Sequence, residues 1–368
     1  MRRPDPGQGA ASRHDGRVRP RPPAPRRGRR LAVAGAVVLG TLALMASPAA
    51  ADPPGPTDYR SEVDEVVPAV DGVAVSVVGG DGFLLVEVDE GTTVEVPGYA
   101  GEPYLRFRED GVVEENQASA ATYLNQSRTR TDADRDYDPD ADPEWKQVAT
   151  DGRWAWHDHR IHYMGQGVPE AARTGRGQTW TVPLVVDGEE VTVTGDYRLL
   201  DAPTPLPWIA VAVVLTLLVA LGLGRLLPAL PAAGAAVLVA GIGGVVAGMA
   251  QRGESPPGAP TSPLVVILPA IAVVAGIIVV IQRGRVLRAV AGLAGAAALG
   301  GWALVRVEVL WRAILPTSLP AATDRLLTAV ALGAAAGAAA LVVRSGALAP
   351  DLSALDDPNP APETAESA

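Results

Sequence analysis

Three histidines and one methionine lie within eight positions, from His157 to Met164. His157 and His159 are separated by one residue, so on an extended backbone their imidazoles point to the same side. A bend near Arg160 would bring the later side chains to the same point. Imidazole suits Cu, Zn and Ni, whereas a thioether sulfur favours Cu(I). The stretch therefore predicts a copper site whose metal ligands are His157, His159, His162 and Met164, with Asp158 as a further ligand or as the partner that orients an imidazole.

Two other interpretations of the same stretch stay open. Arg160 lies inside it, and a guanidinium beside a metal cation is unfavourable unless an acid such as Asp158 neutralises it. The histidines could instead be satisfied polar groups in a packed corner shielded by Trp154 and Trp156. They could also act as a pH-dependent switch, because imidazole titrates near neutral pH.

The remaining sequence offers little catalytic chemistry. It has no cysteine, which excludes disulfides and thiolate sites, and it lacks Gly-x-Ser-x-Gly, a phosphate-cradling Gly-rich loop and His-Glu-x-x-His. Six aspartates alternate from Asp132 to Asp142, but Tyr137 stands where a calcium-binding loop needs glycine, so a solvated loop is favoured over a calcium site. The net charge of -10 and the absence of a basic face beyond the leader exclude nucleic acid as a partner. We expect no enzyme.

The N-terminus has the order of an export signal. Residues 26–30 (RRGRR) are basic, residues 31–46 are apolar, and Ala49-x-Ala51 matches a cleavage site before Asp52. An uncleaved anchor is the alternative. We therefore expect residues 1–51 to be a disordered basic leader plus signal peptide, and the chain beyond it to be exported.

Five apolar segments follow residue 205, each near the ~20 residues that cross a bilayer. They lie at about 207–226, 230–250, 263–282, 286–306 and 322–343. Export of the preceding region, with a modest excess of arginine in the inner loops, predicts a multi-pass protein of the cell membrane whose C-terminus is cytoplasmic. Small residues four apart, as at Gly244 and Gly248, predict a compact five-helix transmembrane bundle over 204–345, although they could also reflect composition alone.

Charged residues gather after the fourth apolar segment. The simpler interpretation is a set of surface ion pairs, and the alternative is a dock on which the exported domain rests. The set comprises Arg306, Glu308, Arg312, Asp324 and Arg325.

Residues 52–203 are typical of an all-β domain. Short Val-rich runs alternate with Gly/Asp turns, and two hairpins are predicted at Asp110-Gly111 and Asp187-Gly188. Seven or eight such strands favour an immunoglobulin-like β-sandwich. Residues 201–207 (DAPTPLP) form a short linker, and residues 346–368 a disordered acidic tail.

Several strings occur in an order that resembles a family of uncharacterised actinobacterial exported multi-pass membrane proteins. They are EPYLR (102–106), ATYLN (121–125), WHDHRxHYM (156–164) and VEVLWRAILPTSLP (307–320). The resemblance spans about residues 60–345 and implies a signal, a β-domain and a helix bundle. It implies no activity.

Together these features predict a membrane-anchored extracytoplasmic protein that handles copper through a His/Met loop. Its partners would be the lipid bilayer and a copper-handling or envelope protein. The alternative is a non-catalytic envelope scaffold, or partner-binding membrane protein, in which the histidine loop is structural.

Overall fold

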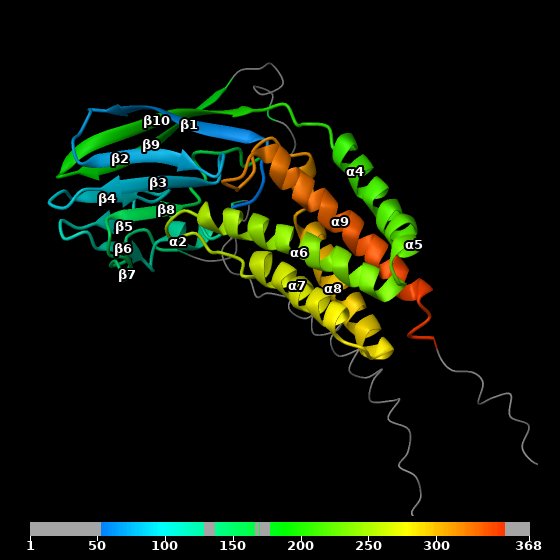
Figure 1. The fold of residues 1–368 in the computed structure, drawn as a ribbon. Helices are drawn as coiled ribbons and strands as arrows, with labels where there is room; N and C mark the ends of the chain where they lie inside the picture. Colours follow the sequence, from blue (N-terminus) through cyan, green and yellow to red (C-terminus); the bar gives the residue numbers. More distant parts are fainter. Residues whose placement is uncertain (1–52, 129–136, 166–168, 170–176, 350–368) are drawn as a thin grey trace, which may run out of the picture.

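The computed structural model describes residues 53–128, 137–165, 169 and 177–349. The predicted leader and signal peptide, Asp132, Asp134 and Asp136 of the aspartate run, and the tail beyond residue 349 lie outside these residues. The described chain has two parts: an antiparallel β-domain followed by long apolar helices, as predicted (Figure 1).

The described residues of the β-domain form two antiparallel sheets. One has seven strands in the order β1-β10-β9-β4-β5-β6-β7, and the other has three in the order β2-β3-β8. The strands are β1 (Tyr59–Val67), β2 (Val73–Val78), β3 (Phe83–Val88), β4 (Val94–Pro97), β5 (Pro103–Phe107), β6 (Val113–Asn116), β7 (Trp145–Ala149), β8 (Arg153–Trp156), β9 (Gln178–Val186) and β10 (Glu189–Leu199).

Both predicted hairpins are present. β9 pairs with β10 around Asp187 and Gly188, whose φ angles of 48° and 86° suit the left-handed turn that an Asp-Gly pair provides. β5 pairs with β6 around Asp110-Gly111. Alternate residues of these strands face inward, and the core between the sheets includes Tyr104, Phe107 and Trp156.

Three strands and one short helix were not predicted. β1, β7 and β8 have polar or charged residues that obscure the apolar alternation, and they are stabilised by pairing with distant strands. The short helix α2 (Ala120–Leu124) begins where Ser119 Oγ accepts a hydrogen bond from the N–H of Ala121.

Within the residues that the structure describes, five helices are long and apolar enough to cross a membrane, and they match the predicted segments to within a few residues. The first is composite: α4 (Leu206–Leu217), a π-helical segment η1 (Leu218–Leu223) and α5 (Gly224–Leu226). The others are α6 (Ala229–Gly253), α7 (Leu264–Ile281), α8 (Arg285–Val305) and α9 (Ala321–Arg344). A 3-10 turn, η2 (Val307–Leu310), follows α8.

Small residues set the spacing between these helices. A Cβ added at Gly248 of α6 would lie 2.1 Å from the carbonyl oxygen of Val265 in α7. One added at Gly333 of α9 would lie 2.6 Å from the carbonyl oxygen of Ala212 in α4. The predicted close packing is therefore confirmed, because no larger residue fits at these contacts without separating the helices.

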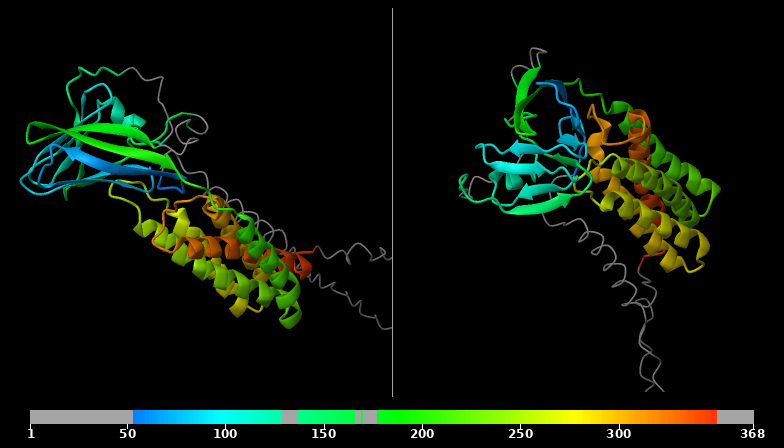
Figure 2. Two further views of the ribbon diagram at one scale, coloured as in Figure 1. Left: turned by 90° about the horizontal axis from the view of Figure 1, so that it is seen from above. Right: turned by 90° about the vertical axis from the view of Figure 1, so that its left-hand side faces the viewer.

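The β-domain sits against one end of the bundle, and the helices extend away from it (Figures 1 and 2). Trp302 is 1% exposed and donates from Nε1 to the carbonyl of Val265 at 2.8 Å. It is a core residue of the bundle at this end.

Candidate functional site

The histidine stretch begins where β8 ends. β8 pairs with β3, and the chain leaves the strand at His157. The N–H of Ile161 then donates to the carbonyl of Asp158 at 3.1 Å, which closes a turn at the place where a bend was expected. Ile161 is 0% exposed in the β-domain core, so packing fixes the turn.

Asp158 is held by its neighbours. It is fully buried and accepts hydrogen bonds from Trp156 Nε1 at 2.9 Å and from the backbone N, Nε and NH2 of Arg160 at 3.0, 2.8 and 2.6 Å. Burial by itself raises the pKa of this carboxyl, but the hydrogen bonds and charge of Arg160 outweigh it and the pKa lies below its ordinary value. Asp158 is thus the anionic partner of Arg160, and its oxygens are occupied.

His157 and His159 each contact a backbone carbonyl. His157 Nδ1 lies 2.6 Å from the carbonyl oxygen of Gly82, and its ring stacks on Phe83 with centroids 4.0 Å apart. His159 Nε2 lies 2.8 Å from the carbonyl oxygen of Ser127. Because a carbonyl only accepts, these two nitrogens carry the protons. Both residues therefore serve as donors that tie the turn to other loops.

His162 differs from the other two. It is 3% exposed, and neither ring nitrogen has a hydrogen-bond partner within the described part of the chain. Its ring centroid lies 5.5 Å from that of His159, edge to face. Burial, then the charge of Arg128 and the proximity of His159, lower the pKa of His162 to about 3, so its imidazole is neutral with an available lone pair.

The structure therefore brings together only part of the predicted ligand set. His159 and His162 are neighbours, whereas His157 and Asp158 are engaged elsewhere and Met164 is 39% exposed. Over the residues that the structure covers, no group of three or more His, Cys, Asp or Glu side chains is arranged to hold a metal ion.

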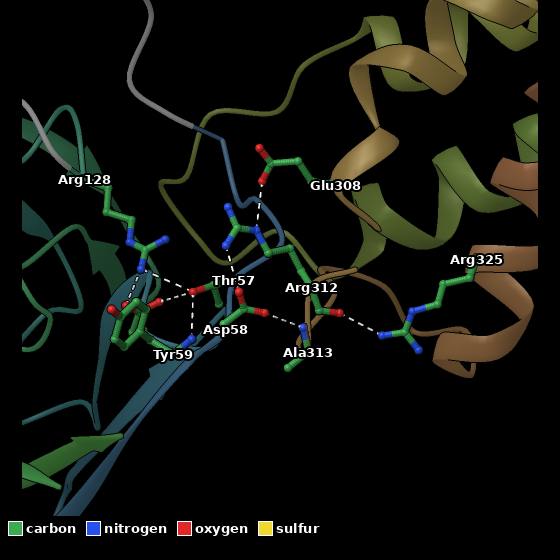
Figure 3. Close-up of polar contacts among 9 residues, drawn as sticks. Thr57, Asp58, Tyr59, Arg128, Glu308, Arg312, Ala313 and Arg325 are labelled. Carbon is green, nitrogen blue, oxygen red and sulfur yellow. Dashed lines mark hydrogen bonds and ion pairs between the residues drawn. The ribbon is translucent and has the colours of Figure 1, made fainter. Parts of the chain in front are cut away.

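A second feature, which the sequence indicated only as an alternative, is the junction between the β-domain and the bundle. Thr57 and Ile314 form an antiparallel bridge, with N–O distances of 3.0 and 2.9 Å. Asp58 accepts from Arg312 NH1 and from the N–H of Ala313, both at 2.8 Å. Figure 3 shows Arg312 lying between Asp58 and Glu308, while its own carbonyl accepts from Arg325 of α9.

The α6–α7 loop forms the other half of the junction. The N–H of Ala155 in β8 donates to the carbonyl of Pro257 at 3.1 Å. Gly258 approaches Trp154 so closely that an added Cβ would lie 2.7 Å from the indole ring. Ala259 packs on the buried cluster that contains Phe83 and Ala155. Strand β8, which leads into the histidine turn, is thus held against the α6–α7 loop of the bundle.

The charged residues after α8 have two roles. Arg312 docks the β-domain, as the alternative interpretation proposed. Arg306 is 4% exposed and donates from NH2 to both carboxylate oxygens of the fully buried Asp324 at 2.7 and 2.8 Å. The simpler interpretation, a set of surface pairs, therefore fails for this buried pair.

A further polar group lies beside the junction and was not predicted from the sequence. Asp81 is fully buried, accepts from Thr57 Oγ1 at 3.0 Å and pairs with Arg128. Burial is the largest cause that raises the pKa of Asp81, and Arg128 opposes it. Asp81 lies in a Gly-rich turn and Arg128 in a loop, so no spacing rule connects them and only the fold reveals the group.

Comparison with protein-family models, with curated proteins and with solved structures finds no match to this chain.

Proposed function

We propose that this chain is a non-catalytic, membrane-anchored scaffold of the cell envelope that engages a protein partner through its β-domain. Residues 26–51 would export the domain, and the five helices would anchor it with the β-domain outside the cytoplasm. The histidine turn is structural in this proposal, because His157, Asp158 and His159 already have protein partners.

The edge strand β2 carries the proposal. It is hydrogen-bonded to β3 alone among the described strands, and its sequence, VAVSVV, contains neither a charge nor a proline. Proteins usually protect such edges with charges, prolines or bulges, because the free N–H and C=O groups recruit another strand. An edge strand without charge or proline is suited to a partner that adds an extended segment to the sheet.

The junction between the β-domain and the bundle supports a role in presenting β2 to a partner. Main-chain hydrogen bonds at Thr57 and at Ala155 attach both sheets of the β-domain to the loops of the bundle. An edge strand on a docked domain has a defined orientation relative to the membrane. This fixed orientation lowers the entropy that is lost when a partner at the membrane surface binds the strand.

In-cell photo-crosslinking tests this proposal. A photoreactive amino acid at the exposed Ser76 of the full-length chain should give a discrete protein adduct, and Ala74→Lys in the same chain should abolish it by charging the edge. The exposed Thr192 of β10, which pairs with β1 on one side and with β9 on the other, is the matched position and should give no such adduct. Equal adducts at both positions, or an adduct insensitive to Ala74→Lys, would refute partner binding at β2.

Copper binding is the second candidate, and the unpaired ring nitrogens of His162 favour it. A neutral imidazole is the form that ligates a metal, and His159 is close enough to supply a second nitrogen after a small movement. The site would then be a two-histidine Cu(I) site rather than the larger predicted set.

Titration of the full-length protein with Cu(I) under reducing conditions separates the two candidates. A two-histidine site predicts one equivalent bound by wild type and by Met164→Leu, and loss of binding in His162→Gln. Loss in Met164→Leu as well would support the larger ligand set. Weak, equal uptake by all three proteins would remove copper and leave the scaffold.

A further inference from the structure

A cavity of about 230 Å³ lies at the end of the bundle that faces the β-domain. Its walls come from the end of α6, the beginning of α7 and the end of α8, and residues 53–56 line it as well. This volume is below the ~300–1,000 Å³ typical of pockets that enclose a whole small molecule. It suits a compact polar headgroup.

Most of the lining is apolar, and the charged groups in its polar part are all positive. It includes two arginines, Arg252 and Arg306, together with hydroxyl groups such as Ser255 and Ser262, and among the described lining residues there is no carboxylate. The carboxylate of Asp324, which does not line the cavity, neutralises Arg306. Arg252 is exposed and has no ion pair in the part of the chain that the structure describes. The cavity therefore retains about one positive charge, and its donors match a phosphate group.

Arg306 supplies an independent indication of a ligand. Its NH1 donates to Gln251 and its NH2 to Asp324, but the buried Nε has no acceptor. An unpaired buried donor on a charged group is costly, so the site is incomplete without an acceptor.

The position of the cavity along the helices indicates which molecule supplies that acceptor. Arg306 directly follows the last residue of the apolar helix α8, and Leu264, which also lines the cavity, is the first residue of α7. The boundary between apolar spans and polar loops is the level of the phospholipid headgroups. Apolar side chains on the bundle side, including Leu268 and Val305, extend the lining toward the acyl region.

We infer that this cavity binds the phosphate of an anionic membrane phospholipid. The phosphate is held by Arg252 and the orphan Nε of Arg306, with the hydroxyl groups as further donors. Because residues 53–56 line the cavity and lead directly into Thr57, lipid binding also stabilises the docked arrangement of the β-domain.

Native mass spectrometry of the full-length protein in detergent tests the inference, with phosphatidylglycerol, phosphatidylcholine and inorganic phosphate as separate probes. Wild type should retain one phosphatidylglycerol, and Arg252→Gln should bind it roughly tenfold more weakly, as expected for the loss of one charge-assisted contact. Ser262→Trp, which fills the cavity, should abolish retention. Arg283→Gln, an exposed arginine at the opposite end of the bundle, is the matched control and should bind like wild type.

A thermal unfolding scan of each variant without lipid verifies that it is folded, and the same scan with phosphatidylglycerol should show a rise in midpoint only where the lipid is retained. Retention unaffected by both Arg252→Gln and Ser262→Trp overturns the site. Equal retention of phosphatidylcholine overturns the charge argument. Binding of inorganic phosphate as tightly as the lipid overturns the lipid as its source.

Discussion

Thr57 and Ile314 form an antiparallel bridge that joins the first residues of the β-domain to the loop between α8 and α9. Both backbone groups of each residue are used, at 3.0 and 2.9 Å, so the contact is part of the folded main chain rather than a side-chain encounter. Thr57 also donates from Oγ1 to the buried Asp81, which ties the bridge to the interior of the β-domain.

The bridge can be trapped covalently. Hydrogen-bonded antiparallel pairs have Cα atoms about 5.5 Å apart, within the range that a disulfide spans. In this cysteine-free chain, Thr57→Cys with Ile314→Cys should therefore oxidise rapidly and completely, as seen by a mobility shift under non-reducing conditions. The control pair Thr57→Cys with Ser345→Cys, at the far end of α9, should stay reduced. Equal oxidation of both pairs would contradict a docked domain.

Protonation of His162 should oppose folding. Its pKa falls from 6.5 to about 3 in the folded chain, so the unfolded state binds the proton first as the pH is lowered. Stability is therefore complete above pH 6.5 and declines between pH 6.5 and 3, by about 1.4 kcal/mol per pH unit. Chemical unfolding of the full chain in detergent at several pH values measures this slope.

His162→Gln is the matched variant for that measurement, because it retains a polar side chain but cannot titrate. The decline that His162 causes between pH 6.5 and 3 should be absent from this variant, whereas carboxylates such as Asp81, whose pKa is raised by burial, and Asp158, whose pKa is lowered by Arg160, should contribute equally to both proteins. A slope equal to that of wild type would show that His162 is not the group responsible.

Loss of the Asp158 carboxylate should be severe. Asp158→Ala leaves the half-buried guanidinium of Arg160 without its anionic partner and the indole N–H of Trp156 without its acceptor, which costs about 3–5 kcal/mol. The exposed pair of Glu87 and Arg153 is the comparison, and Glu87→Ala should cost less than about 1 kcal/mol. Unfolding followed by tryptophan fluorescence reports both values, and similar losses would mean that Asp158 is not the buried anchor of the turn.

Two glycines of α6 should respond oppositely to alanine. Gly248→Ala places a Cβ 2.1 Å from the backbone oxygen of Val265, which cannot move without α7, so we expect a loss of about 1–3 kcal/mol. Gly253, at the end of the same helix, has no atom within 4 Å of an added Cβ, and Gly253→Ala should be neutral or stabilising by up to about 1 kcal/mol. Thermal unfolding in detergent distinguishes them, and equal effects would contradict close α6–α7 packing.

The sequence by itself determined the two-part architecture. Long apolar segments specify membrane-length helices because the requirement depends on length and hydropathy alone, and Asp187-Gly188 specifies its hairpin because the turn is local. The sequence also showed that His157 to His162 could converge only if the chain bends near Arg160, and a turn closed by Ile161 and Asp158 lies there.

Only the tertiary structure decided what those side chains do. His157 and His159 find acceptors on Gly82 and Ser127, while His162 is buried without one, and such pairings depend on which distant loops arrive at the same point. The same reason explains why the docking of Thr57 on Ile314 could not be predicted. Local periodicity reports the environment of a residue, whereas a hydrogen bond between remote segments exists only after the chain has packed.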